Sequence, residues 1–278
     1  SLNLKGDTYP LKKGDIITKV NSTIFEDITL EDAAAVIDEG NDLIKLKVVR
    51  PGGGIIPMLV TTIYIIVLSL LISAPVGILA AIYLNEYARP GRLLNVIRFA
   101  IQNLAGIPSI IYGLFGMLVF VQMLRMQYSI LAGALTLSII LLPTLISTTE
   151  ETLKAIPATY RESSLGLGAT KLQTVYKVVL PGALPGILVA IILSIGRIVG
   201  ESAALLLTAG TVAQIPGSLT GNEAAGATLT TKLYWLIKES GDLSGACGIA
   251  IVLLVLVILL NIISKSITKH FLEKQGNR

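Results

Sequence analysis

The chain has 278 residues, of which 53% are hydrophobic and only 14% charged, with a formal net charge of +4 and a mean hydropathy of +0.76. A soluble domain carries about 25% charged residues, so most of this surface does not face water. Its single cysteine, Cys247, and single histidine, His270, exclude a disulfide framework within the chain and a His/Cys metal cluster.

Residues 1–51 differ from the rest of the chain and predict a small α/β segment. Residues 14–21 and 43–49 alternate apolar and polar side chains as half-buried strands do, and residues 29–37 fit a short helix. A Pro-Gly-Gly-Gly run at 51–54 then predicts a linker. This order resembles the C-terminal half of a PDZ domain. The loop with which such domains bind carboxylates would lie upstream, so a structural insert is favoured over peptide binding.

The remainder, residues 52–278, predicts an all-α polytopic membrane domain, because its uncharged stretches are long enough to cross the hydrocarbon core as helices of about 20 residues. The expected spans are residues 57–84, 99–124, 129–149, 184–208 and 246–265. Eleven lysines and arginines lie in residues 86–98, in residues 150–183 and in the C-terminal tail, against three on the opposite side after the first span. The positive-inside rule therefore predicts that the first group is cytoplasmic, with residues 1–51 outside and the tail inside.

Glycine and proline interrupt the expected spans at Pro75 and Gly77, at Gly106 and Pro108, and at Pro143. In a bundle, neighbouring helices satisfy the backbone groups that such residues free, and small residues let helices approach closely. Kinked and closely packed helices suit a transporter that moves, although static bundles share these features.

The segment between the third and fourth expected spans carries the most informative motif. We expect a first helix to begin at Ala158 or Thr159, with Glu162 in its first turn against the helix dipole. Gly168 then permits a sharp turn, and a second helix over residues 171–179 follows before Pro181 resets the chain direction. Two short helices at an angle form a projection that a partner protein can push. The alternative is an ordinary amphipathic loop at the membrane surface.

This pattern resembles the coupling loop of ABC importer permeases, which has an acidic residue, two small residues, a glycine six positions after the acid and a later Leu-Pro pair. The matching positions are Glu162, Ser163, Ser164, Gly168, Leu180 and Pro181, with serines where alanines are usual. The resemblance implies that residues 158–181 dock on a separate ATPase, which uses the ATP. The sequence contains no Gly-x-x-x-x-Gly-Lys-Ser/Thr phosphate loop, so we expect a transport subunit without an ATPase site or a cofactor of its own.

Arg197 and Glu201 stand inside the fourth expected span, in the run Gly-Arg-Ile-Val-Gly-Glu. Four residues apart on one helix, they would share a face, and charged residues inside a span usually face a bundle interior and are functional. A guanidinium donates bidentate hydrogen bonds to tetrahedral oxyanions, while Glu201 is suited to hold Arg197 or to accept a proton from hydrogen phosphate. We expect both residues to line a substrate pathway. The alternative is a self-neutralised pair that only joins helices.

The glycines Gly196 and Gly200 recur in that run at the same spacing of four residues. Because small residues four apart leave a smooth strip along a helix, they predict a surface against which a partner helix packs.

Three further segments, residues 52–57, 81–88 and 106–113, join these motifs in a wider resemblance. Together they resemble the PstA family of phosphate ABC transporter permeases over about residues 52–278. The resemblance implies a type I ABC importer permease fold in the cell (inner) membrane of a prokaryote. It also implies a PstC-like second permease subunit, a PstB-like ATPase dimer and an external PstS-like phosphate-binding protein. Family members begin with one more helix, so we expect that the chain lacks its natural N-terminus.

Other functions are weighed against phosphate import. A permease of the same type of ABC importer for molybdate, sulfate or phosphonate is a close alternative, although a carboxylate near Arg197 favours a protonatable anion. A channel or secondary transporter would not need the coupling loop. A site-2-type intramembrane metalloprotease needs His-Glu-x-x-His, and a serine-type enzyme needs a base, but the expected spans contain no histidine.

Overall fold

The computed structural model describes residues 16–20, 23–24, 46–49, 54–221 and 224–276. The chain divides into two compact units, Ser1–Gly54 and Ile55–Arg278.

The smaller unit contains an antiparallel sheet with the strand order β2-β1-β3. Its strands are β1 (Ile16–Val20), β2 (Thr23–Ile24) and β3 (Leu46–Val49). β1 pairs with β3 from Ile16 opposite Val49 to Val20 opposite Leu46. The strands expected within residues 14–21 and 43–49 are therefore present. The helix expected over residues 29–37 and most of the predicted linker lie outside the described residues, and the PDZ-like character stays a prediction.

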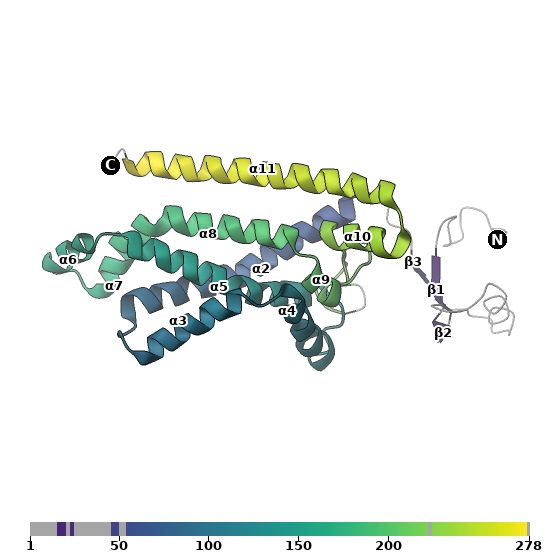
Figure 1. Ribbon diagram of the computed structural model, residues 1–278, viewed down its shortest axis with the longest axis horizontal. Helices are drawn as coiled ribbons and strands as arrows, with labels where there is room; N and C mark the ends of the chain where they lie inside the picture. The colour runs from purple at the N-terminus through teal and green to yellow at the C-terminus, as the bar shows by residue number, and fades with distance from the viewer. Residues whose placement is uncertain (1–15, 21–22, 25–45, 50–53, 222–223, 277–278) are drawn as a thin grey trace. The chain divides into compact units, whose positions relative to one another are not determined.

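The larger unit is a helix bundle (Figure 1). Four helices in the described part of the chain are long and apolar enough to cross a membrane without a break: Ile56–Tyr87, Ile130–Ala155, Lys171–Gly200 and Leu243–Ile263. The first comprises α2 (Ile56–Ile82) and the π-helical turn η2 (Tyr83–Tyr87), the second is α5 (Ile130–Ala155), and the last lies within α11 (Leu243–Gly276). The spans expected at residues 57–84, 129–149 and 246–265 are confirmed.

The span expected at residues 99–124 is not one straight helix. α3 (Arg92–Ala105) and α4 (Ser109–Gly116), which continues as the π-helical η3 (Met117–Met123), are bent by 96°. The chain turns at Gly106 and Pro108, and Pro108 lacks the amide hydrogen that a continuous helix needs. The expected span is therefore present as a pair of helices divided at these residues, with a sharper break than the expected kink, and the pair makes a fifth span if both halves cross together.

The span expected at residues 184–208 also ends early. α7 (Lys171–Thr174), η4 (Val175–Val179) and α8 (Leu180–Gly200) form one continuous helix, which stops at Gly200. Glu201 then adopts an extended conformation, and a short helix, α9 (Ala203–Thr208), follows. Pro181 follows the π-helical turn η4 inside this continuous helix. The expected change of direction at Pro181 is therefore wrong.

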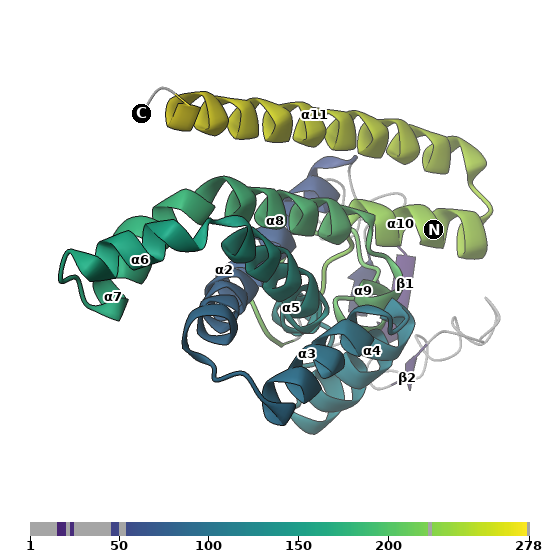
Figure 2. The same cartoon turned by 60° about the vertical axis from the view of Figure 1, so that its left-hand side comes forward.

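α5 forms the centre of the bundle. The apolar window of α5 is 67% buried, against 11% for α11, which lies along one side of the bundle next to α8 (Figures 1 and 2). A Cβ atom added at Gly77 of α2 would lie 2.8 Å from Cβ of Leu145, and one at Gly186 of α8 would overlap the Thr152 side chain. Small residues therefore bring α2 and α8 against α5, as the sequence predicts.

Candidate functional site

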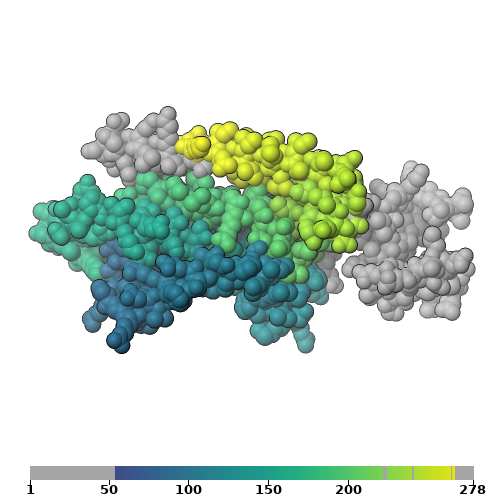
Figure 3. Space-filling model, in the orientation of Figure 1, coloured from purple at the N-terminus to yellow at the C-terminus, as the bar shows by residue number. Residues whose placement is uncertain are grey.

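The chain between α5 and α8 forms an exposed projection, residues 158–174, at the end of the bundle where α11 also terminates (Figures 1 and 3). It consists of α6 (Ala158–Gly166) and α7. Gly168, with φ of +86°, turns the chain between them in a conformation that favours glycine. Thr170 and Gln173 then form a capping box at the start of α7. The predicted helix start at residue 158, the turn and the second helix are all confirmed.

A hydroxyl pair joins the two helices of this α6–α7 projection. Ser164 Oγ lies 2.9 Å from Thr174 Oγ1, and Thr174 is buried. Ser163 and Glu162 are exposed, and Glu162 is the fifth residue of α6, whose first turn carries no acidic residue. The prediction that Glu162 stabilises the first turn is therefore wrong, and its carboxylate is available to a partner.

Large apolar side chains cover the outside of the projection. Leu167, at the turn, is 89% exposed. Tyr160, Leu165 and Leu172 are also exposed on the projection, and Tyr176 is exposed in η4 directly after it. Fully burying a side chain of this size is worth about 1.5–3 kcal/mol, and an exposed apolar patch is typical of an interaction surface.

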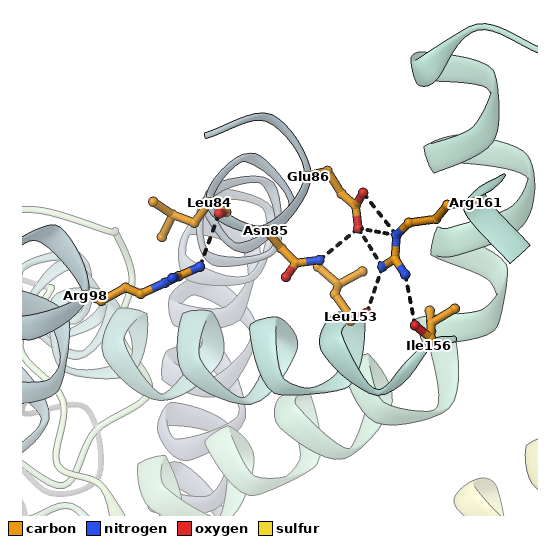
Figure 4. Close-up of polar contacts among 7 residues, drawn as sticks. All are labelled: Leu84, Asn85, Glu86, Arg98, Leu153, Ile156 and Arg161. Atoms are coloured by element: carbon orange, nitrogen blue, oxygen red, sulfur yellow. Dashed lines mark hydrogen bonds and ion pairs between the residues drawn. The ribbon is translucent and has the colours of Figure 1, made fainter. Parts of the chain in front are cut away.

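A charged pair attaches the projection to the end of the first span (Figure 4). Arg161 Nη2 lies 2.7 Å from Glu86 Oε1, and Arg161 Nε donates to both carboxylate oxygens at 3.1 and 3.3 Å. Only 7% of the Glu86 side chain and 21% of the Arg161 side chain are exposed. Asn85 Nδ2 also donates to Glu86 Oε1, at 2.8 Å. The same guanidinium donates to the carbonyls of Leu153 and Ile156, where α5 ends, at 2.8 and 2.9 Å.

Sequence reasoning did not single out Glu86 and Arg161 as a pair. The two residues are 75 positions apart, and each stands beside residues that a family motif already explains. The available signal was an ionisable residue directly at the end of an apolar span. Such a residue needs a partner when it is buried, but only the tertiary fold identifies that partner.

A second charged cluster joins α3 to α5 at the same end of the bundle. Glu150 of α5 is buried and forms ion pairs with Arg98 of α3 and, at 2.9 Å, with Lys154. Arg98 Nη2 also lies 3.4 Å from the carbonyl oxygen of Leu84 in η2, to which it donates (Figure 4). The end of the first span is thus contacted by arginines from two different helices.

Arg197 lies in the last turn of α8 and is half-buried. Its Nη1 donates a hydrogen bond of 3.0 Å to Thr144 Oγ1 of α5. Within the described residues, Thr144 is the only hydrogen-bond partner of this guanidinium, which has five N–H donors. Thr144 was not predicted, although a hydroxyl next to Pro143 inside a span is a visible signal.

Glu201 binds other helices than Arg197 does. Its Oε1 accepts a 3.2 Å hydrogen bond from the amide of Ala204 in α9, and its backbone oxygen accepts one of 2.7 Å from Thr230 Oγ1 in α10 (Leu229–Trp235). The ion pairs among the described side chains do not include Arg197 with Glu201. The predicted shared helical face is therefore wrong, because α8 ends between the two residues.

The surface around Gly196 and Gly200 is not covered by another described part of this chain. A Cβ atom added at Gly196 or at Gly200 would have no neighbour within 4 Å. No described helix of this chain therefore packs closely on the strip that they form, and its partner helix stays a prediction.

The bundle and its exposed α6–α7 projection define a class of membrane transport subunit. The family described as "Binding-protein-dependent transport system inner membrane component" matches residues 73–275. The chain therefore belongs to this family and is a multi-pass membrane protein, a transport component that is not itself catalytic.

Within this family, the chain is similar to individual named proteins. The chain is 39% identical over 166 residues to the probable ABC transporter permease protein YqgI of Bacillus subtilis, covering 60% of this chain and 56% of that protein. It is 31% identical over 210 residues to the phosphate transport system permease protein PstA of Mycobacterium leprae, covering 76% of this chain and 69% of that protein. The chain thus spans little more than half the length of YqgI.

A solved structure shares the fold. A chain of the MetNI methionine ABC transporter, in an inward-facing conformation, matches with a TM-score of 0.60 at 21% identity, covering 78% of this chain and 94% of that one. At this identity the likeness shows the fold alone, and it confirms the predicted type I ABC importer permease architecture.

Proposed function

We propose that the chain is the membrane-spanning permease subunit of an ATP-driven importer of inorganic phosphate. The observation that carries this proposal is Arg197, a half-buried guanidinium inside an apolar bundle, whose one hydrogen bond to the described part of the chain goes to Thr144. An arginine at the centre of a span costs roughly 2.5–3.5 kcal/mol on insertion scales, and charged residues within spans usually face a bundle interior or a pathway, so Arg197 is expected to act on a passing ion. The choice of phosphate as substrate is supported by the similarity to the PstA relative, which is named as a phosphate transport system permease.

The chemistry of Arg197 suits a tetrahedral oxyanion. Its planar fork presents several donors in a fixed geometry, and one bond to Thr144 leaves the others for a ligand. Because Thr144 accepts that bond, its own hydroxyl hydrogen is left to donate to an anion or to the backbone. The pair therefore offers hydrogen-bond donors from α5 and from α8 to one passing ion.

Glu201 supplies the acceptor that phosphate needs and sulfate does not. One of its oxygens, Oε1, accepts the Ala204 amide. We assign to Oε2 the role of accepting the proton of hydrogen phosphate, an interaction that an unprotonated sulfate cannot make. In this role Glu201 lines the path at the break between α8 and α9.

The α6–α7 projection is the proposed docking site of a separate ATPase. Glu162 and Leu167 are exposed on it, with the other apolar side chains around them. The eleven basic residues of the predicted cytoplasmic side include those of this segment, so the positive-inside rule favours a cytoplasmic projection and tail with residues 1–51 outside. The partners are then a PstB-like ATPase dimer that binds the ATP, a PstC-like permease subunit and an external PstS-like binding protein.

Uptake of radiolabelled phosphate into vesicles that carry the reconstituted complex tests the proposal. We expect ATP-dependent uptake that excess phosphate abolishes and that sulfate and molybdate leave unchanged. Uptake of molybdate, sulfate or phosphonate in place of phosphate would identify another oxyanion importer. Phosphate movement without ATP would instead favour a channel or a secondary transporter.

A further inference from the structure

We infer that the π-helical turn η2, at the end of the first span, is the element that receives movement of the α6–α7 projection. Glu86 and Arg161 are the positioning residues of this connection. The inference rests on the proposed docking of an ATPase on the projection, but it does not depend on which substrate is carried.

Both helices of the projection contact η2. From α6, Arg161 forms the ion pair with Glu86. From α7, the Nζ atom of Lys171 lies 5.2 Å from the ring centroid of Tyr87, a cation–π contact. Two contacts from two helices to neighbouring residues of one turn fix the orientation of the projection relative to the first span, which a single contact would not do.

The ion pair is built to transmit force and not merely to neutralise charge. The Glu86 side chain is 7% exposed, so its carboxylate is removed from water and is held by Arg161 and Asn85 (Figure 4). Removing one partner would leave the other charge buried without compensation, which makes separation of the pair costly. A guanidinium that contacts both carboxylate oxygens also restricts rotation about the contact.

The turn η2 is connected onward to the rest of the bundle. It continues α2 without a break, and its Leu84 is buried, with a carbonyl that accepts from Arg98 of α3. Movement of η2 therefore reaches α2 directly and α3 through Arg98.

The competing recipient is α5, whose last carbonyls, those of Leu153 and Ile156, also bind Arg161. The projection follows α5 directly along the chain, so α5 needs no side chain to follow its movement. The first span, in contrast, lies 75 residues earlier in sequence, and the ion pair supplies the connection that the backbone does not.

Two variants separate these recipients in the assembled complex. In a Lys171→Ala background, which removes the cation–π contact to Tyr87, Arg161→Ala removes the remaining side-chain contact to η2 described above and the contacts to α5. Glu86→Ala in the same background removes the ion pair to η2 and leaves the carbonyls of α5 available to Arg161. We expect both variants to keep ATP hydrolysis while the substrate moved per ATP falls about tenfold, since residues of one charged network couple on this scale. Arg92→Ala, an exposed position in the same region without an ion pair among the described residues, is the control and leaves the ratio unchanged.

A distance measurement keeps the test independent of the cargo. In a Cys247→Ser, Lys171→Ala background, paired spin labels are placed at Thr159→Cys and Ile258→Cys, or at Tyr83→Cys and Ile258→Cys, all at exposed positions. ATP binding to the complex is expected to shift both distances. In Glu86→Ala the shift at position 159 persists and the shift at position 83 is lost. Where an alanine variant does not assemble, Glu86→Gln and Arg161→Lys take its place with a smaller loss.

A shift at position 83 that persists in Glu86→Ala would overturn the inference and make α5 the recipient. Failure of the unaltered complex to carry phosphate would refute only the proposed substrate, because the distance changes require ATP and the projection alone. Absence of any ATP-dependent shift at position 159 would refute the docking on which the inference rests.

Discussion

The α6–α7 projection and the α8–α9 break are built in opposite ways. The projection is held together by its own contacts, namely a capping box at Thr170, a glycine turn at Gly168 and the hydroxyl pair of Ser164 with Thr174. At the break, Arg197 binds α5, while Glu201 binds α9 and α10. One region is therefore a rigid body, and the other is a junction at which different helices meet.

This difference indicates how the two regions divide the work of transport. A rigid, exposed body transmits a push without deforming. A junction whose two charged residues bind different helices changes its geometry when those helices move. Movement of α8 relative to α9 would alter the separation of Arg197 and Glu201, whose side chains form hydrogen bonds to different helices, α5 and α9. Substitutions at the junction should therefore change the uptake or selectivity of the ion. Substitutions on the projection should change the association of the ATPase or its coupling to transport.

The largest effect is expected from Arg197→Ala. It removes the charged donor from the proposed path, and hydrogen bonds to charged groups are worth about 1.5–3 kcal/mol, so uptake should fall roughly 10- to 100-fold. Radiolabelled phosphate uptake measures the loss, and co-purification of the ATPase should be unchanged. Thr144→Val, which keeps the charge and removes its hydrogen-bond partner, should cost less. Normal uptake by Arg197→Ala would exclude the proposed path.

Glu162→Lys tests the projection. Unlike Arg197→Ala, it should reduce the association of the ATPase with the complex. It reverses an exposed charge on the docking surface, and unfavourable charge contacts at interfaces cost several kcal/mol, so ATPase association should fall about tenfold or more. Quantitative co-purification with the ATPase measures this loss. The neighbouring exposed position supplies a matched control, Ser163→Ala, which should retain association. If Glu162→Lys binds the ATPase normally, the docking surface lies elsewhere.

Glu201→Gln sharpens the role of the junction. The amide oxygen still accepts from Ala204, so the start of α9 should be retained, but the amide nitrogen cannot accept a proton from hydrogen phosphate. We expect the preference for phosphate over sulfate to fall about tenfold, as the loss of one charged hydrogen bond implies. Competition of sulfate against labelled phosphate measures the preference. An unchanged preference would leave Glu201 as a residue that only positions α9.

The two regions also differ in what the sequence predicts. The projection follows from local signals, since the start at residue 158, the glycine turn and the second helix depend on neighbouring residues. The end of α8 does not, because apolar residues resume at Ala203 directly after Glu201 and Ser202, so the segment reads as one span through Thr208. The same limit applies to Glu86 with Arg161 and to Thr144 with Arg197, whose partners are 75 and 53 residues away. Pro108 was a visible interruption, but the size of the bend, 96°, was not predicted.

A smaller effect on stability is expected at the contact between α4 and α9. A Cβ atom at Gly113 would lie 2.8 Å from the backbone Cα of Ala204, so Gly113→Ala should push the two helices apart at a cost of about 1–3 kcal/mol. Thermal unfolding in detergent measures the loss. Gly196→Ala has open space around the new Cβ and should be neutral or gain up to about 1 kcal/mol from helix propensity. Equal effects of the two substitutions would contradict the close approach at Gly113.

The smallest effect is expected from Ser164→Ala, which puts the more usual alanine into the coupling motif. The substitution removes the hydroxyl that lies 2.9 Å from buried Thr174 Oγ1, so it loosens the contact of α6 with α7 by about 0.5–1.5 kcal/mol. The loss should appear as faster hydrogen exchange of the α7 amides, with little change in uptake, because the ion pair of Arg161 with Glu86 still attaches α6 to the first span. Ser163→Ala, at an exposed position, should change neither quantity. If Ser164→Ala instead uncouples ATP hydrolysis from uptake, then internal rigidity of the projection, and not its attachment to η2, limits transmission.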